Sequence, residues 1–345
     1  MKTHDGRAAL DLVRGIAALL IVVYHYGRWF AIPLALNSSL AVDLFFCLSG
    51  YVMMTAYSCR LTSDMSRVEF FSARLIRLMP LAILGTLMSA SYAASLLYMK
   101  GGSASLQDIA TSALVGALNL PNFFSNLNRG DDQVFPLNGP QYSLFFEMVV
   151  NIAWAYWSWT RKCIPAILLS ILCFCFVINL GVLGGDTSTN FLAGFPRVGA
   201  SFFYGVVLFH VERRLDRSMS LRPVFLVSGL ISFLLFCFPF ALPFKIEIAW
   251  VAVGSPVLIL SGSRTNLSGR LGQLALYLGK ISYPVYILHY PVFCWVNGAF
   301  QSVAGRQDFV LEALLLMIAI LLTSHLAAKV QDRSWRFSKS KALPC

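Results

Sequence analysis

Apolar residues along this chain come in runs long enough to cross a lipid bilayer. A helix rises about 1.5 Å per residue, so about 20 apolar residues cover roughly 30 Å of hydrocarbon. Such runs predict ten transmembrane helices, at residues 8–27, 40–58, 78–98, 141–159, 164–181, 195–211, 223–241, 246–262, 275–297 and 308–328. Few of them carry the polar stripe of a helix in a large soluble core. The pattern predicts an all-α polytopic membrane protein.

The charged loops predict how these helices are oriented. Lys and Arg gather in the loop 59–77, in the turn after the fourth run, in the loops 212–222 and 263–270, and after residue 328. Loops rich in Lys and Arg face the cytoplasm, which places both termini there. The shorter run 111–124, interrupted by Pro121 and Asn122, then cannot cross, and we expect it to be re-entrant or to lie flat on the outer face. One membrane domain is expected over residues 1–330, with a short basic cytoplasmic tail at 331–345.

Composition narrows the class further. The chain is 57% hydrophobic and only 12% charged, whereas a soluble domain is roughly a quarter charged. Its net charge of +11 is scattered over short loops, which does not indicate a nucleic-acid partner. The eight cysteines show no CxxC spacing, and no zinc motif, glycine-rich phosphate loop or GxSxG elbow is present, so no metal is implied. The first run lacks a small-residue cleavage site and is expected to remain as a span.

Several ionisable residues fall inside the predicted spans. Such groups cost roughly 2.5–3.5 kcal/mol each on insertion scales and are usually functional. Five helices place one each at a similar depth in the outer half: His25, Asp43, Glu147, Arg197 and His289. The cytoplasmic side carries Arg14, Arg74 and Arg77. This distribution predicts an outer pocket with a basic inner vestibule, suited to a ligand that enters from the cytosol and is anionic at its cytosolic end.

Five stretches, in order and spacing, carry a resemblance to a known family. They are LDLVRGIAALLIVVYHYG, AVDLFFCLSGYVM, FFSARLIRLMP, GPQYSLFFEMVVN and ISYPVYILHYPV, with FPRVGASFFYGVVLF as a looser match. Together they resemble the acyltransferase-3 family of membrane acyltransferases over almost the whole chain. Tyr142 stands where that family usually has Trp. The chain is similar to the stand-alone members, which lack a fused extracytoplasmic domain.

The resemblance implies a reaction. The family transfers acyl groups from cytosolic acyl-CoA to acceptors at or beyond the membrane, often O-acetylating bacterial surface polysaccharides. It implies that Arg14, His25, Arg74 and Arg77 are functional. It also implies acyl-CoA, with acetyl-CoA expected, as a co-substrate rather than a permanently bound cofactor. The expected partners are a carbohydrate or lipid-linked acceptor and the lipid bilayer, and the expected location is a bacterial cytoplasmic (inner) membrane.

Acyl transfer to a hydroxyl needs a base and stabilisation of an oxyanion, and His25 is our candidate for the base. Asp43, at a similar depth, is expected to orient its imidazole. Direct transfer and a transient acyl-histidine both remain open. The alternative for His25 is a structural histidine at a helix interface.

Arginines are the candidate ligands of the donor. Arg74 and Arg77 are three residues apart, and their guanidinium groups match the phosphates of CoA. Arg14 is expected to line the route of the pantetheine arm. The alternatives are ordinary cytoplasmic loop charge for the pair and a side chain that snorkels toward lipid headgroups for Arg14.

The remaining candidates concern the acceptor. We expect Glu147 to take part in catalysis, either by pairing with Arg197 or a protonated histidine or by hydrogen bonding an acceptor hydroxyl; a purely structural pair is the alternative. Tyr142, Ser143, Arg197 and His289 are candidate acceptor-binding residues. For His289, packing at a helix kink is an equal alternative.

Two other classes of function fit parts of the pattern. A transporter or flippase of a glycan or small organic acid would also place charges at mid-membrane, but it usually shows paired repeats or matching broken helices, and the sequence shows neither. A receptor-like helical bundle is disfavoured by the intramembrane charges. The sequence does not indicate the acceptor's identity, the acyl chain length or the oligomeric state.

Overall fold

The structure is a computed structural model that describes residues 7–100, 105–127, 132–216, 219–305 and 308–339, and it is helical throughout these ranges apart from turns and a single isolated β-bridge. The α-helices are α1 (Arg7–Trp29), α2 (Ala41–Tyr57), α3 (Arg60–Ser63), α4 (Arg67–Lys100), α5 (Leu106–Ala117), α6 (Gln141–Tyr156), α7 (Cys163–Leu180), α8 (Gly194–Glu212), α9 (Arg222–Phe236), α10 (Phe244–Ala249), α11 (Ser255–Ser263), α12 (Gly269–Ala304) and α13 (Phe309–Lys339). The shorter turns are the 3-10 segments η1 (Ser38–Leu40), η2 (Ser158–Arg161) and η3 (Phe191–Ala193) and the π-helical η4 (Trp250–Gly254).

The predicted membrane-spanning class is confirmed. Within the described residues, seven helical segments are long and apolar enough to cross a bilayer: Arg7–Trp29, Ser38–Tyr57, Arg67–Met99, Cys163–Leu180, Phe191–Glu212, Phe244–Ser263 and Phe309–Gln331. The other three predicted runs coincide with α6, α9 and α12. Helices α6 and α9 have 16 and 15 residues, while α12 has 36 and contains two prolines. The count of ten spans and the position of the termini stay predictions.

Two helices extend beyond the predicted spans. The loop 59–77 is largely helical, because α4 begins at Arg67 and runs for 34 residues. Phe70 and Leu78, two turns apart, are both buried, so the arginine-rich stretch is an amphipathic helix rather than a loop. At the other end, α13 continues to Lys339, so most of the predicted tail 331–345 is helix, and 340–345 lie outside the described residues.

The chain divides into two compact units. The first comprises Met1–Phe71, Phe146–Gly185 and Thr189–Ser282, and the second Ser72–Phe145, Asp186–Ser188 and Tyr283–Cys345. Helices α4, α6 and α12 each contribute residues to both.

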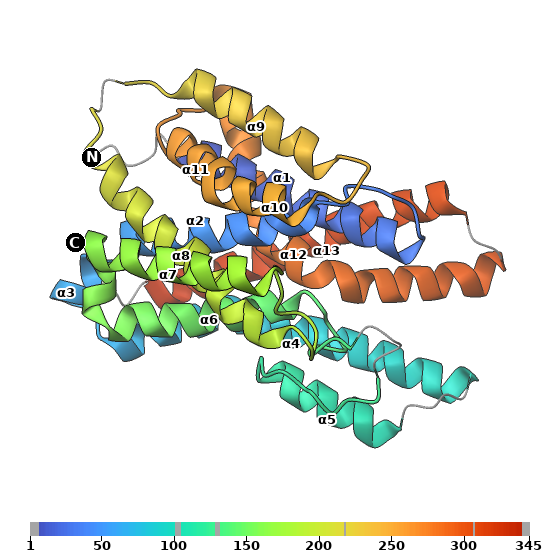
Figure 1. Ribbon diagram of the computed structural model, residues 1–345. Helices are drawn as coiled ribbons and strands as arrows, with labels where there is room; N and C mark the ends of the chain where they lie inside the picture. The colour runs from blue at the N-terminus through green and yellow to red at the C-terminus, as the bar shows by residue number, and fades with distance from the viewer. Residues whose placement is uncertain (1–6, 101–104, 128–131, 217–218, 306–307, 340–345) are drawn as a thin grey trace. The chain divides into compact units, whose positions relative to one another are not determined.

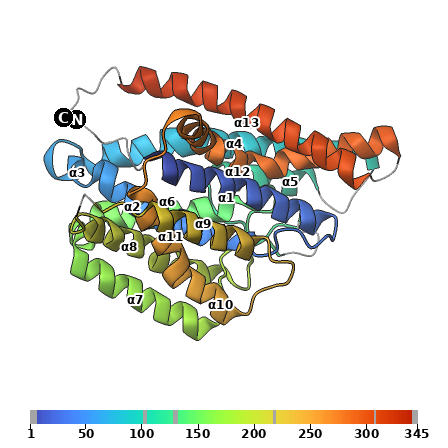
Figure 2. The same cartoon turned by 90° about the horizontal axis from the view of Figure 1, so that it is seen from above.

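Close packing of α2 against α8 organises the first unit. A Cβ atom added to Gly50 would lie 1.9 Å from the carbonyl oxygen of Phe202, and one added to Gly205 would lie 1.9 Å from that of Cys47. Only glycine permits this backbone approach, which is how membrane helices gain packing contact. Helix α7 lies beside α8 on another side (Figures 1 and 2), and Ser170 of α7 donates a hydrogen bond to the carbonyl of Ala200.

Helix α5 is packed against α4 in the second unit. Ile109 of α5 and Ala90 of α4 are buried in one apolar cluster with Leu137. Gly116 of α5 faces Thr86, whose methyl group would lie 3.1 Å from an added Cβ. The predicted weak run 111–124 thus covers the second half of α5, a 12-residue helix that is too short to cross a bilayer, and the irregular segment that follows it.

Candidate active site

Arg14 of α1 is held by groups of the protein. Its Nε donates a hydrogen bond to Ser282 Oγ at 2.9 Å, and its Nη2 donates to the carbonyl of Gly279 and lies 2.9 Å from Asp11 Oδ1. A Cβ atom at Gly279 would lie 2.3 Å from Asp11, so glycine at this position lets α12 approach α1. Arg14 therefore fastens α1 to α12 with a side chain that is still 28% exposed.

His25 lies on the same side of α1 as Arg14. Eleven residues make about three helical turns, so the two side chains are separated by about 16 Å along the axis and only about 20° around it. The imidazole is half-buried, with ring centroids 5.0 Å from Tyr24 and 5.9 Å from Trp29. This spacing puts a guanidinium and an imidazole at two levels of a single face.

Asp43 and Arg197 form a buried ion pair. The carboxylate is completely buried and accepts hydrogen bonds from Arg197 Nε at 3.0 and 3.2 Å and from Nη2 at 2.7 Å. Nη1 donates to the carbonyls of Leu183 and Gly184, at 3.1 and 3.2 Å. The guanidinium thus joins α2, α8 and the segment before α8, a fork geometry that arginine suits.

This pairing corrects one expectation. Asp43 was expected to orient the imidazole of His25, but its carboxylate contacts Arg197, and no contact with His25 is found among the described residues. Arg197, a candidate for the acceptor, has its donors directed at the protein. Glu247 of α10 lies within electrostatic range of the pair. The pair joins α2 to α8 and to the segment before α8.

Glu147 has one partner that the sequence did not predict. Its carboxylate accepts a hydrogen bond from Ser49 Oγ of α2 at 3.0 Å, and Arg197 is engaged with Asp43 instead. Glu147 is half-buried and acts electrostatically on Arg14. The first unit therefore gathers Arg14, Glu147 and Ser49 near one another.

Arg74 and Arg77 of α4, the two arginines expected to bind the acyl donor, differ in exposure. Both are in the third turn of the helix or close to it, and Arg74 is buried at 3% exposure while Arg77 is exposed. The main-chain carbonyl of Arg77 accepts a hydrogen bond from Gln331 of α13. Of the two, Arg77 is the guanidinium that a soluble ligand reaches directly.

The start of α6 and the middle of α12 share a hydrogen-bonded cluster in the second unit. Ser143 Oγ lies 2.7 Å from Tyr286 Oη, and that hydroxyl donates to the carbonyl of Pro140. His289 is fully buried, and its Nδ1 lies 2.7 Å from the carbonyl of Tyr286. Because a carbonyl only accepts, this hydrogen bond puts the proton on Nδ1 and leaves the lone pair of the neutral ring on Nε2. Tyr142, between these groups in sequence, is half-buried.

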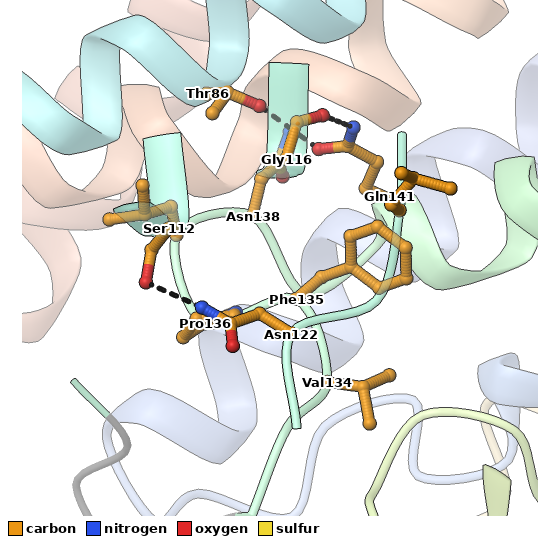
Figure 3. A pocket seen from close by; sticks show the side chains of 11 residues that line it. Thr86, Ser112, Gly116, Asn122, Val134, Phe135, Pro136, Asn138 and Gln141 are labelled. Carbon is orange, nitrogen blue, oxygen red and sulfur yellow. Dashed lines mark hydrogen bonds between the residues drawn. The ribbon is translucent and has the colours of Figure 1, made fainter. Parts of the chain in front are cut away.

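A small pocket in the second unit, lined by amides and hydroxyls as well as apolar side chains, was not predicted (Figure 3). Gln141 accepts a hydrogen bond from Thr86 at 3.0 Å and donates one to the carbonyl of Gly116, and Asn122 donates to Ser112 at 3.1 Å. Asn138 donates to the carbonyl of Ile287. The cavity measures about 10 Å³, which is close to the space of one water. The signal available in the sequence was the pair of amides in LNGPQYS, directly before an apolar run.

The site does not have the make-up of a metal centre. No group of three or more His, Cys, Asp or Glu side chains suited to a metal ion occurs in the part of the chain that the structure describes. The arrangement offers a base, cations and hydrogen-bonding side chains, which are the components of acid–base group transfer.

Comparisons with known proteins point the same way. A family model described as an acyltransferase domain matches residues 7–329. The chain is 38% identical over 159 residues to a protein of Rhizobium radiobacter named "Protein 2 in picA locus", an alignment that covers 43% of this chain and 81% of that protein. No solved structure matches.

Proposed function

This chain belongs to the acyltransferase-3 family and is an integral membrane acyltransferase, and from that premise we propose that it moves an acyl group from cytosolic acyl-CoA to a hydroxyl of a glycan or another acceptor at or beyond the membrane. Acetyl is the acyl group we propose, and the membrane is the bacterial cytoplasmic one. Ten spans with both termini in the cytoplasm complete the proposal, because the basic loops then all face one side.

The observation that carries the proposal is the geometry of α1. Arg14 and His25 lie on one face of a membrane-spanning helix, about 16 Å apart along its axis. That separation is too great for both to touch one reacting carbonyl. It suits a long, flexible donor whose arm passes Arg14 and whose thioester ends at His25. The contacts of Arg14 with Asp11 and Ser282 fix where such an arm would pass.

The chemistry follows from a neutral imidazole at position 25. His25 removes the proton of the acceptor hydroxyl as its oxygen attacks the thioester carbonyl. The tetrahedral intermediate collapses with cleavage of the carbon–sulfur bond, and the imidazolium returns the proton to the departing CoA thiolate. In the other route the imidazole attacks the thioester carbonyl first and expels the CoA thiolate. The acceptor hydroxyl then attacks the acyl-histidine, which frees the imidazole, and the hydroxyl proton passes to the thiolate. Both routes need the imidazole of His25.

We assign the CoA phosphates to Arg77 and Arg74. Arg77 is exposed on α4 and offers a planar guanidinium that fits phosphate oxygens. Arg74, one turn earlier and buried, is placed to support it rather than to meet the ligand first. Glu147, bonded to Ser49 and close to Arg14, is proposed as the acidic group that balances the charge on the donor route.

The test is acyl transfer by the purified full-length protein in lipid nanodiscs. Labelled acetyl-CoA is supplied with a panel of sugars, and acceptor-dependent release of CoA and acylated sugar are measured by mass spectrometry. We expect His25→Ala to abolish transfer while the protein remains folded.

His210→Ala is the matched control, since His210 is a half-buried histidine of α8 whose Nε2 lies 2.8 Å from the carbonyl of Arg161. It is expected to keep transfer. Most of the activity surviving in His25→Ala would remove that residue from the mechanism. Movement of a labelled glycan across the bilayer without CoA release would indicate a transporter instead.

A further inference from the structure

A second, larger cavity lies beside α5. None of the residues that line it belongs to the apolar cluster that packs α5 against α4. It is a groove of about 300 Å³ between α5 and the segment 121–125, the lower end of the range for small-molecule sites. Its lining combines two aromatic rings and other apolar side chains with amides, hydroxyls and one carboxylate, chiefly Gln107, Asp108, Thr111, Asn122, Phe124 and Ser125. None of these residues was used in the proposed reaction.

The groove is built in advance by hydrogen bonds between its two walls. Ser112 Oγ of α5 lies 3.0 Å from Ser125 Oγ and accepts a hydrogen bond from Asn122. Asn122 Oδ1 in turn accepts from the main-chain N–H of Phe124. A segment tied to its helix at several points loses little further freedom when a ligand binds.

An exposed aromatic ring stands at the edge of this groove. Phe124 is 92% exposed at the edge of the groove, next to the amide of Asn122 and the hydroxyls of Thr111 and Ser125. An apolar plane beside amide and hydroxyl groups matches a sugar ring, whose C–H face stacks on an aromatic ring while its hydroxyl groups exchange hydrogen bonds.

Charge restricts which sugars fit. Asp108 is the charged member of the lining, and its hydrogen bonds with Ser105 at the start of α5 hold its pKa below the usual range. An ionised carboxylate accepts from hydroxyl or ammonium groups and repels carboxylates and phosphates. The groove therefore suits a neutral or amino sugar and disfavours an anionic one.

We infer that this groove binds one sugar unit of the acceptor, stacked on Phe124 and hydrogen bonded to Asn122 and Asp108. This inference rests on the proposed function, since it names the acceptor class for that reaction. Asn122 lines both this groove and the small pocket of Gln141, which directly precedes Tyr142 and Ser143. A sugar in the groove would thus be in contact, through Asn122, with the start of α6.

Direct binding is tested by saturation-transfer difference NMR on the full-length protein in nanodiscs. The probes are methyl β-D-galactoside, N-acetylglucosamine and glucuronic acid. We expect signal from the two neutral sugars and little from glucuronic acid. Phe124→Ala should reduce the neutral-sugar signal at least fivefold, and Asp108→Asn, which keeps an oxygen for the helix cap, should raise the signal of glucuronic acid.

The matched control is Leu114→Ala, because Leu114 is an apolar residue of α5, 65% exposed, that does not line the groove. It should bind as the parent does. In the transfer assay Phe124→Ala should raise the acceptor KM about tenfold, with kcat and the acetyl-CoA KM unchanged.

The outcomes separate this inference from the proposed function. Equal saturation transfer in Phe124→Ala and the parent, as a lipid-facing ring would give, overturns the groove as a sugar site, as does the absence of signal from either neutral sugar. If the sugars bind as expected but no donor is ever consumed, the transferase proposal fails and the groove stands. If His25→Ala abolishes transfer while Phe124→Ala leaves the acceptor KM unchanged, the transferase proposal stands and the groove is not the acceptor site.

Discussion

Removal of Arg197 should destabilise the protein through the charge it leaves behind. Asp43 is 0% exposed and Arg197 5% exposed, so Arg197→Met leaves a buried carboxylate with no counter-ion. Breaking a buried pair in this way costs about 3–5 kcal/mol. The carbonyls of Leu183 and Gly184 lose a donor as well, at about 1 kcal/mol for each bond. We therefore expect a loss in the free energy of unfolding of at least about 3 kcal/mol.

A second substitution should restore part of that loss. Asp43→Asn removes the stranded charge, so the double variant Asp43→Asn plus Arg197→Met is expected to be more stable than Arg197→Met alone. The comparison is Arg7→Met, which removes an exposed arginine from Asp11 while Asp11 keeps Arg14 as its counter-ion, and this should cost within about 0.5 kcal/mol. Unfolding in mixed detergent micelles, followed by circular dichroism, gives the three free energies.

Activity measurements on the same variants decide between two roles for Asp43. A structural pair predicts that Asp43→Asn lowers stability and leaves the pH dependence of kcat unchanged in the protein that remains folded. If Asp43→Asn keeps full stability, lowers kcat and shifts the pH profile, the carboxylate serves His25 after all. An Arg197→Met variant as stable as Arg7→Met would refute the reasoning from burial.

Two further predictions concern helix packing and the donor. Gly205→Val should destabilise the α2–α8 contact by about 3 kcal/mol or more, since its Cβ would lie 1.9 Å from a backbone oxygen that cannot move away. Gly229→Ala on α9 is the control: the nearest atom to the added Cβ would be 3.8 Å away, so this variant should be neutral or slightly stabilising. Thermal unfolding of both variants in detergent checks this, and equal melting would contradict it. Arg77→Ala should raise the acetyl-CoA KM about tenfold or more at unchanged kcat and stability, because the exposed guanidinium is removed without opening the core; a fall in kcat at constant KM, measured by steady-state kinetics, would exclude a role in binding the donor.

Hydropathy predicted most of the fold. The run 164–181 is α7 (Cys163–Leu180) and the run 8–27 is α1 (Arg7–Trp29) almost to the residue. One error concerned a charged stretch that is helical: the arginine-rich residues before position 78 were predicted as a loop but form the start of α4. The run 246–262 is confirmed as the segment Phe244–Ser263, but the π-helical turn Trp250–Gly254 inside it was not predicted.

The candidate site was only partly accessible to sequence reasoning. The spacing of Arg14 and His25 on one helix is a local property, and the structure keeps them on one face as the helical repeat requires. The sequence could not identify the partner of Asp43, because His25 and Arg197 were both predicted at the same depth in the membrane as Asp43. The tight approach of α2 to α8, through Gly50 and Gly205, accompanies the pairing with Arg197.

The sequence by itself determined that the chain is a bundle of apolar helices, that basic loops alternate along it, and that a cation and an imidazole share the first helix. Each of these depends on residues near one another in the chain. Only the tertiary structure decided that Asp43 pairs with Arg197, that Glu147 meets Ser49, and that a small pocket and a groove form around α5. The physical reason is that burying apolar area sets which segments are helices, whereas side-chain size and backbone approach set which helix faces meet.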